Sequence, residues 1–322
     1  MKLTSLASFL PAVLSALSVF ATPNPIAGGD GIVVRDPAIA YNSASGKYFL
    51  FATDENIKIF TSTSLTGPWE RHGSVVPNCS VIQKQGRCNL WAPDVFFYNN
   101  RWAVYYSVSW IGLQDSAIGV AVSDTMEEGT WTDLGQVIAS TGADVFNAID
   151  PNVIDDNGLK LAFGSYWEGI YQIGLWPDVN NQASDLPGTH LAGGGGRPAE
   201  GGFVYKPQSQ PYFYLFFSEG TTLSDSKPAP GAEYKVLVGR GHSGQGPFYD
   251  QNGSILTNAN AGTLVLGSHD NVYAPGGQSV IRDPVSGRDV MVYHYIPNDK
   301  YPTNSVLGIN YLDFSSGWPV VV

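Results

Sequence analysis

The stretch from residue 36 to residue 51 reads Asp36-Pro-Ala-Ile-Ala-Tyr41, then a turn with Gly46, then Lys47-Tyr-Phe-Leu-Phe51. A short apolar run, a polar turn and an aromatic run predict a β-hairpin. The pattern returns four more times, in units that begin at Pro93, Asp150, Glu200 and Gly277. A repeat at this spacing is the first feature to interpret, because repeated units of 20 to 50 residues or more determine an architecture.

Each unit has room for four short strands. Turn-and-aromatic signals follow some of the hairpins, at Gly67-Pro-Trp69, Gly129-Thr-Trp131 and Gly246-Pro-Phe248. Five such units predict an all-β protein, a five-bladed β-propeller. A β-sandwich would not repeat five times, and a right-handed β-helix would need a shorter repeat.

The chain shows no linker composition that would divide it, so residues 22–322 are predicted to form a single domain. In propellers the last strand of the ring often comes from the other terminus. Residues 28–35 and residues 306–314 are the two stretches expected to serve in this way.

Composition excludes several classes of protein. The 322 residues are 43% hydrophobic and only 14% charged, which excludes a disordered chain. The net charge is −11 and no basic run occurs, so a nucleic-acid partner is not expected.

Residues 1–21 combine Lys2, an apolar stretch and a small-residue cleavage pattern ending at Ala21. They predict a secretory signal peptide and hence a secreted protein, expected to be monomeric and not bound to a membrane.

Two cysteines occur, Cys79 and Cys88. In a secreted chain they are expected to form a disulfide that closes a small loop, the alternative being two free buried thiols. Zinc is not expected, because no further cysteine or histidine pair lies nearby. Asn78-Cys-Ser80 and Asn252-Gly-Ser254 are sequons, so Asn78 and Asn252 are predicted glycosylation sites.

Three of the five units begin with a carboxylate: Asp36, Asp150 and Glu200. The pseudo-symmetry of a propeller would bring these three side chains to one height around the central channel. A single Asp-Pro is commonly only a turn initiator, but three acids in register favour a functional site. A pair of carboxyl groups, one acid and one base, is the equipment of glycoside hydrolysis.

Aromatic residues close to these acids fit a sugar ligand, because the apolar face of a sugar stacks on such rings. Trp91 precedes the second unit, and Gly164-Ser-Tyr-Trp167 follows the third hairpin. The alternative for any single aromatic side chain is core packing, in a chain with 8 Trp, 17 Tyr and 15 Phe.

These motifs together resemble glycoside hydrolase family 43, and within it the endo-acting arabinanases of fungi. The segments that carry the resemblance are Arg35-Asp-Pro37, Trp91-Ala-Pro-Asp94, Asp115-Ser-Ala-Ile-Gly119, Asn147-Ala-Ile-Asp-Pro151, Phe163-Gly-Ser-Tyr-Trp167, Ala199-Glu-Gly-Gly202 and Tyr273-Ala-Pro-Gly-Gly-Gln278. The resemblance covers about residues 28–322. It implies a five-bladed propeller that cleaves internal α-1,5-L-arabinofuranosidic bonds of linear or debranched arabinan with inversion.

The resemblance also implies roles for single residues. Asp36 would be the general base, Glu200 the general acid, and Asp150, ionised, the group that keeps Glu200 protonated. The expected substrate-binding residues are Trp91, Gly112, Asn147, Ser165, Tyr166 and Trp167. His294 would hold a metal ion, Ca²⁺, largely through water, whereas on residues alone it is more readily a core histidine. No organic cofactor is expected.

Other functions remain open at this stage. Exo-acting α-L-arabinofuranosidases and β-xylosidases belong to the same family, and Arg35 stands where arabinanases often have histidine. A non-catalytic carbohydrate-binding propeller is a further alternative, in which the three acids would be dispensable. A retaining, fructan-active propeller is disfavoured, because its nucleophile motif is absent.

Overall fold

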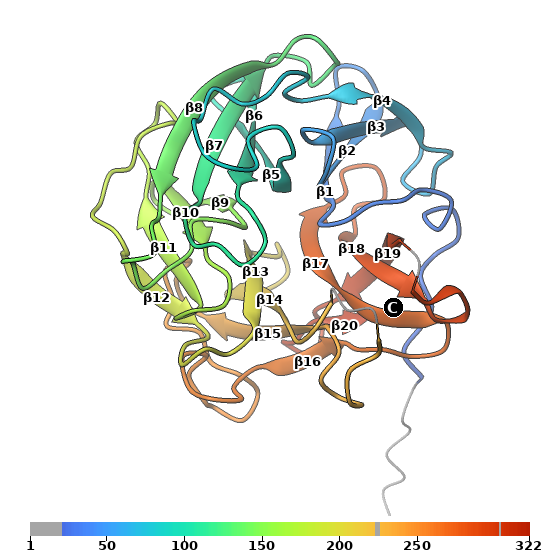
Figure 1. Cartoon of the computed structure of the whole chain (residues 1–322). Coiled ribbons are helices and arrows are strands. Elements are labelled where there is room, and N and C mark those ends of the chain that lie inside the picture. The colour runs from blue at the N-terminus through green and yellow to red at the C-terminus, as the bar shows by residue number, and fades with distance from the viewer. Residues whose placement is uncertain (1–20, 223–225, 303) are drawn as a thin grey trace, which may run out of the picture.

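Each of the five repeats folds into one four-stranded antiparallel sheet, and the five sheets stand as blades around a central axis (Figure 1). The computed structural model describes residues 21–222, 226–302 and 304–322. The blades follow the chain in order, with β1–β4 in blade I, β5–β8 in blade II, β9–β12 in blade III, β13–β16 in blade IV and β17–β20 in blade V. The prediction of an all-β, five-bladed propeller is confirmed.

The first two strands of every blade are the two halves of the predicted hairpins. The first strands, nearest the axis, are β1 (Ala38–Asn42), β5 (Trp91–Tyr98), β9 (Asn152–Asp155), β13 (Ala199–Tyr205) and β17 (Val272–Arg282). The second strands are β2 (Lys47–Ala52), β6 (Arg101–Val108), β10 (Leu159–Phe163), β14 (Phe213–Glu219) and β18 (Asp289–Pro297).

The outer strands complete the blades. The third strands are β3 (Lys58–Ser62), β7 (Ala117–Ser123), β11 (Ile170–Gly174), β15 (Lys235–Gly241) and β19 (Val306–Asp313). The fourth strands are β4 (Glu70–Ser74), β8 (Thr132–Ala139), β12 (Thr189–Ala192), β16 (Thr263–Leu266) and β20 (Val320–Val321). A 3₁₀ turn, η1 (Asn298–Lys300), follows β18.

The second strands are apolar along most of their length because both of their faces are covered by neighbouring blades. In β2, Phe49 and Phe51 face blade II, whereas Tyr48, Leu50 and Ala52 face blade V. Each of the five junctions between blades holds its own apolar cluster of this kind. The core is therefore a ring of five layers rather than one central mass.

The ring closes without exchange of a strand between the termini, so neither of the two expected stretches plays that part. Residues 306–313 form β19 inside blade V. Residues 28–35 make only one isolated bridge, Val33 with Val306. The segment before β1 instead runs along β19, where Ile26 N donates to Ile309 O (2.9 Å) and Val34 N donates to Ser305 O (3.1 Å).

Buried polar groups join the first strands to one another around the axis. Val153 N donates to Asp94 Oδ2 (2.7 Å), and Val204 N donates to Asn152 Oδ1 (2.8 Å). Gln278 Nε2 donates to Gly201 O (2.8 Å), and Ser279 Oγ donates to Pro37 O (2.9 Å). These bonds hold the channel ends of neighbouring blades at fixed heights, which is where the candidate site lies.

The predicted signal peptide falls on residues 1–21, almost wholly outside the described residues. The cleavage after Ala21, and with it the start of the domain at Thr22, stays a prediction. Within the described part of the chain, no helix has the length and apolar character needed to cross a membrane.

Candidate active site

Besides Asp270 and Ala274 of blade V, each blade has one residue with a left-handed backbone conformation in its first strand or at most two residues before it. These residues are Asp36, Ala92, Asp150, Gly201 and Gly277, with φ of 47°, 44°, 55°, 61° and 56°. Asp36 and Asp150 are thus equivalent, as the sequence predicted. In blade II the equivalent residue is Ala92 rather than Pro93, and Glu200 lies one position before its blade's left-handed residue, where the pairing of β13 with β14 shifts register. Left-handed residues other than glycine collect at functional sites.

A second series of polar residues, which comes from the second strands or directly after them, supports this ring. Thr53, Ser107 and Ser218 accept the backbone N–H of Ala92 (2.8 Å), Asp150 (3.0 Å) and Gly277 (2.9 Å), each in the next blade. In blade V the same position is His294, whose Nδ1 accepts from Asp36 N (3.2 Å). In blade III it is Ser165, whose Oγ donates to Glu200 Oε2 (2.6 Å).

The three acids open into one cleft of about 1770 Å³ at this end of the propeller. All six residues predicted to bind substrate line it together with Asp36, Asp150 and Glu200; the six are Trp91, Gly112, Asn147, Ser165, Tyr166 and Trp167. Asn147 Oδ1 is buried and has no hydrogen-bond partner in the part of the chain that the structure describes. An unsatisfied polar atom in a cleft is available to a ligand hydroxyl.

The surroundings of Asp36 favour its ionised form. Thr53 Oγ1 donates to Asp36 Oδ2 (2.7 Å), and the Arg35 guanidinium approaches the same oxygen (3.8 Å). Burial alone would raise the pKa of Asp36, but Arg35, His294 and Thr53 outweigh it and lower the pKa to about 2. Asp36 is therefore a carboxylate over the whole range in which enzymes work, as a general base requires.

The surroundings of Glu200 and Asp150 act in the opposite direction. Burial raises the pKa of Glu200, against hydrogen bonds from Ser165 and from Tyr234, whose hydroxyl donates to Glu200 Oε1 (2.9 Å). Burial and the nearby Glu200 raise the pKa of Asp150 well above its ordinary value. Burial and mutual repulsion thus oppose simultaneous ionisation of the two carboxyl groups, and the role of Asp150 as the ionised partner stays a prediction.

Gly277 explains why blade V contributes no fourth carboxylate. A Cβ at this position would lie 2.4 Å from Asp36 Oδ1 and 2.7 Å from His294 Nδ1. The space that a side chain would fill is occupied by the candidate base and by the histidine behind it. Glycine is required here by close approach rather than by positive φ, which Asp36, Ala92 and Asp150 adopt with a side chain.

His294 is fully buried, and its Nε2 has no hydrogen-bond partner among the described residues. Within the described residues, no group of three or more His, Cys, Asp or Glu side chains could hold a metal ion. A single unpartnered histidine nitrogen fits an ion whose remaining ligands are water. Nε2 can bind a cation only when Nδ1 carries the ring proton. Nδ1 would then donate to Asp36 Oδ1, 3.4 Å away, instead of accepting from Asp36 N.

The rim of the cleft is aromatic and partly strained. Tyr166 and Trp167 have φ of 53° and 40°, and Tyr166 is exposed. The neighbouring loop presents Trp110, Ile111 and Leu113 to solvent along the same cleft. Exposed aromatic side chains beside a polar site are suited to the apolar faces of sugar rings.

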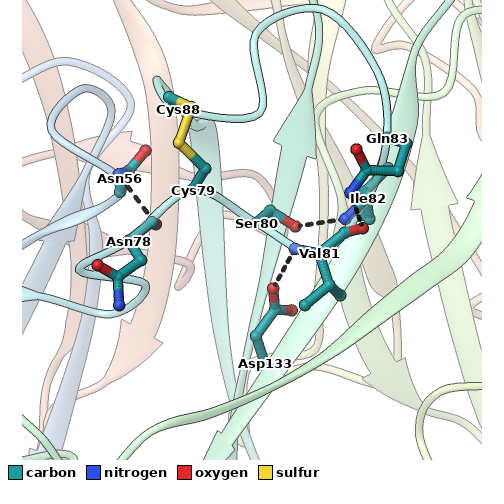
Figure 2. Close-up of a disulfide and its surroundings, with 9 residues drawn as sticks. All are labelled: Asn56, Asn78, Cys79, Ser80, Val81, Ile82, Gln83, Cys88 and Asp133. Carbon is teal, nitrogen blue, oxygen red and sulfur yellow. Dashed lines mark hydrogen bonds between the residues drawn. A yellow bond between two sulfur atoms is a disulfide. The ribbon is translucent and has the colours of Figure 1, made fainter.

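Cys79 and Cys88 form the predicted disulfide, which closes the loop before β5 (Figure 2). Val81 N donates to Asp133 Oδ2 (3.0 Å), and Asn56 Nδ2 donates to Asn78 O (3.1 Å), so blades I and II both hold this loop. Gly86, inside the loop, packs against the backbone of Ser109, next to the cleft loop of residues 110–113.

The two sequons lie away from the cleft lining, and both asparagines are exposed. Asn78 is the residue before the disulfide (Figure 2). Asn252 lies in a turn organised by Asp250 Oδ1, which accepts from Asn252 N and Ser254 N (2.9 Å each). Their glycosylation stays a prediction.

Sequence reasoning missed three contributors to the site: Thr53, Ser107 and Tyr234. Thr53 and Ser107 belong to a detectable series, because a polar residue follows the aromatic or apolar run of every second strand. Tyr234 lies outside the five hairpins, directly before β15, and no pattern distinguishes it from the other tyrosines.

Comparison with known proteins now connects this geometry to a family. The model of "Glycosyl hydrolases family 43" matches residues 22–319. The chain belongs to this family. It is therefore a glycoside hydrolase, and an organic cofactor is not expected of it.

Three similar proteins show the range within the family. The chain is 43% identical over 324 residues to an arabinan endo-1,5-α-L-arabinosidase A of Aspergillus aculeatus, covering 96% of this chain and 99% of that protein. It superimposes on an exo-1,5-α-L-arabinanase from a bovine ruminal metagenomic library with a TM-score of 0.80 and 28% identity, covering 94% and 99% of the two chains. An α-L-arabinanase of Cellvibrio cellulosa, solved with arabinohexaose, gives a TM-score of 0.80 and 27% identity, covering 90% and 96%.

Proposed function

We propose that this family 43 hydrolase cleaves internal α-1,5-L-arabinofuranosidic bonds of linear or debranched arabinan. The full-length similarity to the fungal endo-1,5-α-L-arabinosidase supports this substrate. The single observation that carries the endo mode is the size of the cleft. About 1770 Å³ exceeds the roughly 300 to 1,000 Å³ of an ordinary small-molecule pocket and has room for several sugar units.

In the proposed reaction Asp36 removes a proton from a water molecule, and that water attacks the anomeric carbon of the arabinofuranosyl unit. Glu200 gives its proton to the glycosidic oxygen as the bond between that oxygen and the anomeric carbon breaks. The pKa of about 2 for Asp36 and the raised pKa of Glu200 support this division of roles. The attack from the opposite face gives inversion, for which two carboxyl groups about 6.5 to 9.5 Å apart are expected.

Asp150 is proposed to keep the general acid, Glu200, protonated. Its Oδ2 accepts from Gly201 N (3.0 Å), the residue directly after Glu200, so it is fixed beside the acid. Because two neighbouring carboxylates are costly in a buried site, an Asp150–Glu200 pair retains one proton up to a higher pH than either group alone. A glycosidic oxygen in the cleft would then receive that proton from Glu200.

Product analysis on linear 1,5-arabinan tests the proposed function. A ladder of arabino-oligosaccharides at early times is the result expected of endo action. Arabinose or a single short product from the first time point would instead support an exo-acting enzyme. This is the second candidate function, and the structural similarity to the exo-1,5-α-L-arabinanase favours it. No hydrolysis of arabinan, with hydrolysis of xylan fragments, would overturn the substrate.

We further propose that His294 Nε2 is the one protein ligand of a Ca²⁺ ion otherwise held by water. The unpartnered, fully buried nitrogen supports this assignment. Such an ion would supply fixed positive charge in the channel, close to three acids. Chelation should lower the melting temperature and the activity of wild type, with recovery on adding Ca²⁺, and should leave the melting temperature of His294→Gln unchanged.

The predicted cleavage after Ala21 makes the mature protein a secreted one, expected to be monomeric. N-terminal sequencing of the protein from the culture medium tests the cleavage site. A mature chain that starts far from Thr22 would contradict it.

A further inference from the structure

We propose that Tyr234 is the positioning residue of the acid: its hydroxyl fixes Glu200 and stabilises the negative charge that forms on Glu200 as the proton leaves. This inference rests on the proposed function, in which Glu200 is the general acid.

The first observation is the contact itself. Tyr234 OH donates to Glu200 Oε1 (2.9 Å), while Ser165 Oγ donates to Glu200 Oε2 (2.6 Å). Each oxygen of the carboxyl therefore has one hydroxyl donor. A carboxylate accepts such bonds more strongly than the neutral acid does, so both bonds strengthen as the proton is transferred.

The second observation is the rigidity of the tyrosine. Its side chain is only 2% exposed, and its ring lies nearly parallel to that of His294, with centroids 5.8 Å apart. On another side, Gly276 allows close packing, because a Cβ there would lie 2.1 Å from Tyr234 Cε1. A hydroxyl held from several directions is already in place before the reaction, which is the condition for effective charge stabilisation.

The third observation is the position of Tyr234 between the two catalytic groups. Its hydroxyl contacts Glu200, and its ring contacts His294, whose Nδ1 accepts from the backbone of Asp36. The backbone of Tyr234 is fixed as well, because Tyr234 N donates to Thr221 O (3.0 Å) in the cleft lining. Tyr234 thus spans the distance from the acid to the histidine that supports the base.

The groups that face Glu200 come from several elements. Arg35 and Asp36 approach from the start of blade I, Asp150 from blade III, and Tyr166 from the loop after β10. Tyr234→Phe leaves all of them in place and keeps the ring that stacks on His294. Only the hydroxyl donor is lost, so the free carboxylate of Glu200 becomes less stable.

The test is the pH dependence of kcat and kcat/KM of Tyr234→Phe on linear arabinan. We expect kcat to fall by roughly tenfold or more with little change in KM, because the bond matters most in the transition state. The alkaline limb, above which Glu200 has lost its proton, should move up by about one pH unit. Ser165→Ala should move it in the same direction.

A second readout changes the leaving group. An aryl arabinotrioside with a 4-nitrophenyl leaving group departs with little help from an acid. Tyr234→Phe should therefore lose much less activity on the aryl substrate than on arabinan. Equal losses on both substrates with an unmoved alkaline limb would show a merely structural role and overturn the proposal.

Tyr273→Phe is the matched control. Tyr273 belongs to the same small cluster and is 8% exposed, and its hydroxyl has no hydrogen-bond partner within residues 21–222, 226–302 and 304–322. Removal of this hydroxyl should leave the rates and the pH profile unchanged. If wild type itself does not hydrolyse arabinan, the proposed function fails; if wild type is active and Tyr234→Phe matches Tyr273→Phe, only the role of Tyr234 fails.

Discussion

The two sides of the cleft hold carboxyl groups in opposite surroundings. On the blade I side, Asp36 lies beside Arg35 and accepts from Thr53, and its pKa falls to about 2. On the side of blades III and IV, Asp150 and Glu200 lie near each other, and burial raises both pKa values although Arg35 acts against the rise. The difference shows that contacts to Arg35, His294 and Thr53 outweigh burial at Asp36, whereas burial prevails at Asp150 and Glu200.

The largest effect is expected when either catalytic carboxyl is removed. Asp36→Asn and Glu200→Gln should each lower kcat/KM on arabinan by about 10²- to 10⁴-fold, because general acid and base catalysis contribute that much. Circular dichroism should show an unchanged fold. Near-normal activity of either variant would contradict the assignment of Asp36 as the general base or of Glu200 as the general acid.

Close packing behind the base gives the next effect. Gly277→Ala places a Cβ 2.4 Å from Asp36 Oδ1, so the base must move, and a roughly 10²-fold loss of kcat is expected. Gly46→Ala is the control, because Gly46 also has positive φ (68°) but has open space around its Cβ position. Both variants should lose about 1 kcal/mol of unfolding free energy from backbone strain. Equal activities of the two would contradict the proposed crowding.

Removing the cation should make the base side resemble the acid side. Arg35→Gln takes away the charge that lowers the pKa of Asp36. Because Asp36 must be ionised to act, the acidic limb of kcat/KM should move to higher pH by about one unit. The alkaline limb should also move to higher pH, because Arg35 lowers the pKa of Glu200 as well. A profile that keeps its acidic limb would mean that Thr53 and His294 alone hold Asp36 ionised.

The smallest effect is on stability. Asp150→Asn removes one of two buried carboxyl groups whose pKa values are raised by folding. Such groups stabilise the fold least at high pH, so the variant should melt about 2 °C above wild type at pH 8 and equal it near pH 4. The alkaline limb of its residual activity should move to lower pH. A variant that melts lower at pH 8 would contradict the repulsion between Asp150 and Glu200.

The repeat allowed the fold to be predicted from sequence, because each hairpin is encoded locally by a turn between two apolar runs. Asp36 and Asp150 could also be identified from the sequence, since they hold equivalent positions in their units. Ring closure was not predictable from sequence, because residues 28–35 and 306–314 were both candidates for the closing strand. In the structure the second stretch forms β19 within its own blade, and the first makes one isolated bridge to it.

The hydrogen-bond partners of the acids were harder to predict from the sequence. Ser165 was predicted to contact substrate, and in the structure its hydroxyl donates to Glu200. Tyr234 reaches Glu200 only because the loop between β14 and β15 returns to the channel. Contacts of this kind depend on side chains from different blades meeting in space, and no spacing within one repeat encodes them.

The uninterrupted order of the blades also bears on how the protein is made. As the chain emerges from the ribosome, each new blade can cover the free face of the one before it. One face of blade I, with Leu50 and Phe60, waits until Val292 and Ile309 of blade V have been synthesised. An incomplete chain therefore exposes an apolar surface at the junction between the first and last blades, and in the complete chain the segment before β1 is hydrogen-bonded along β19 at this junction.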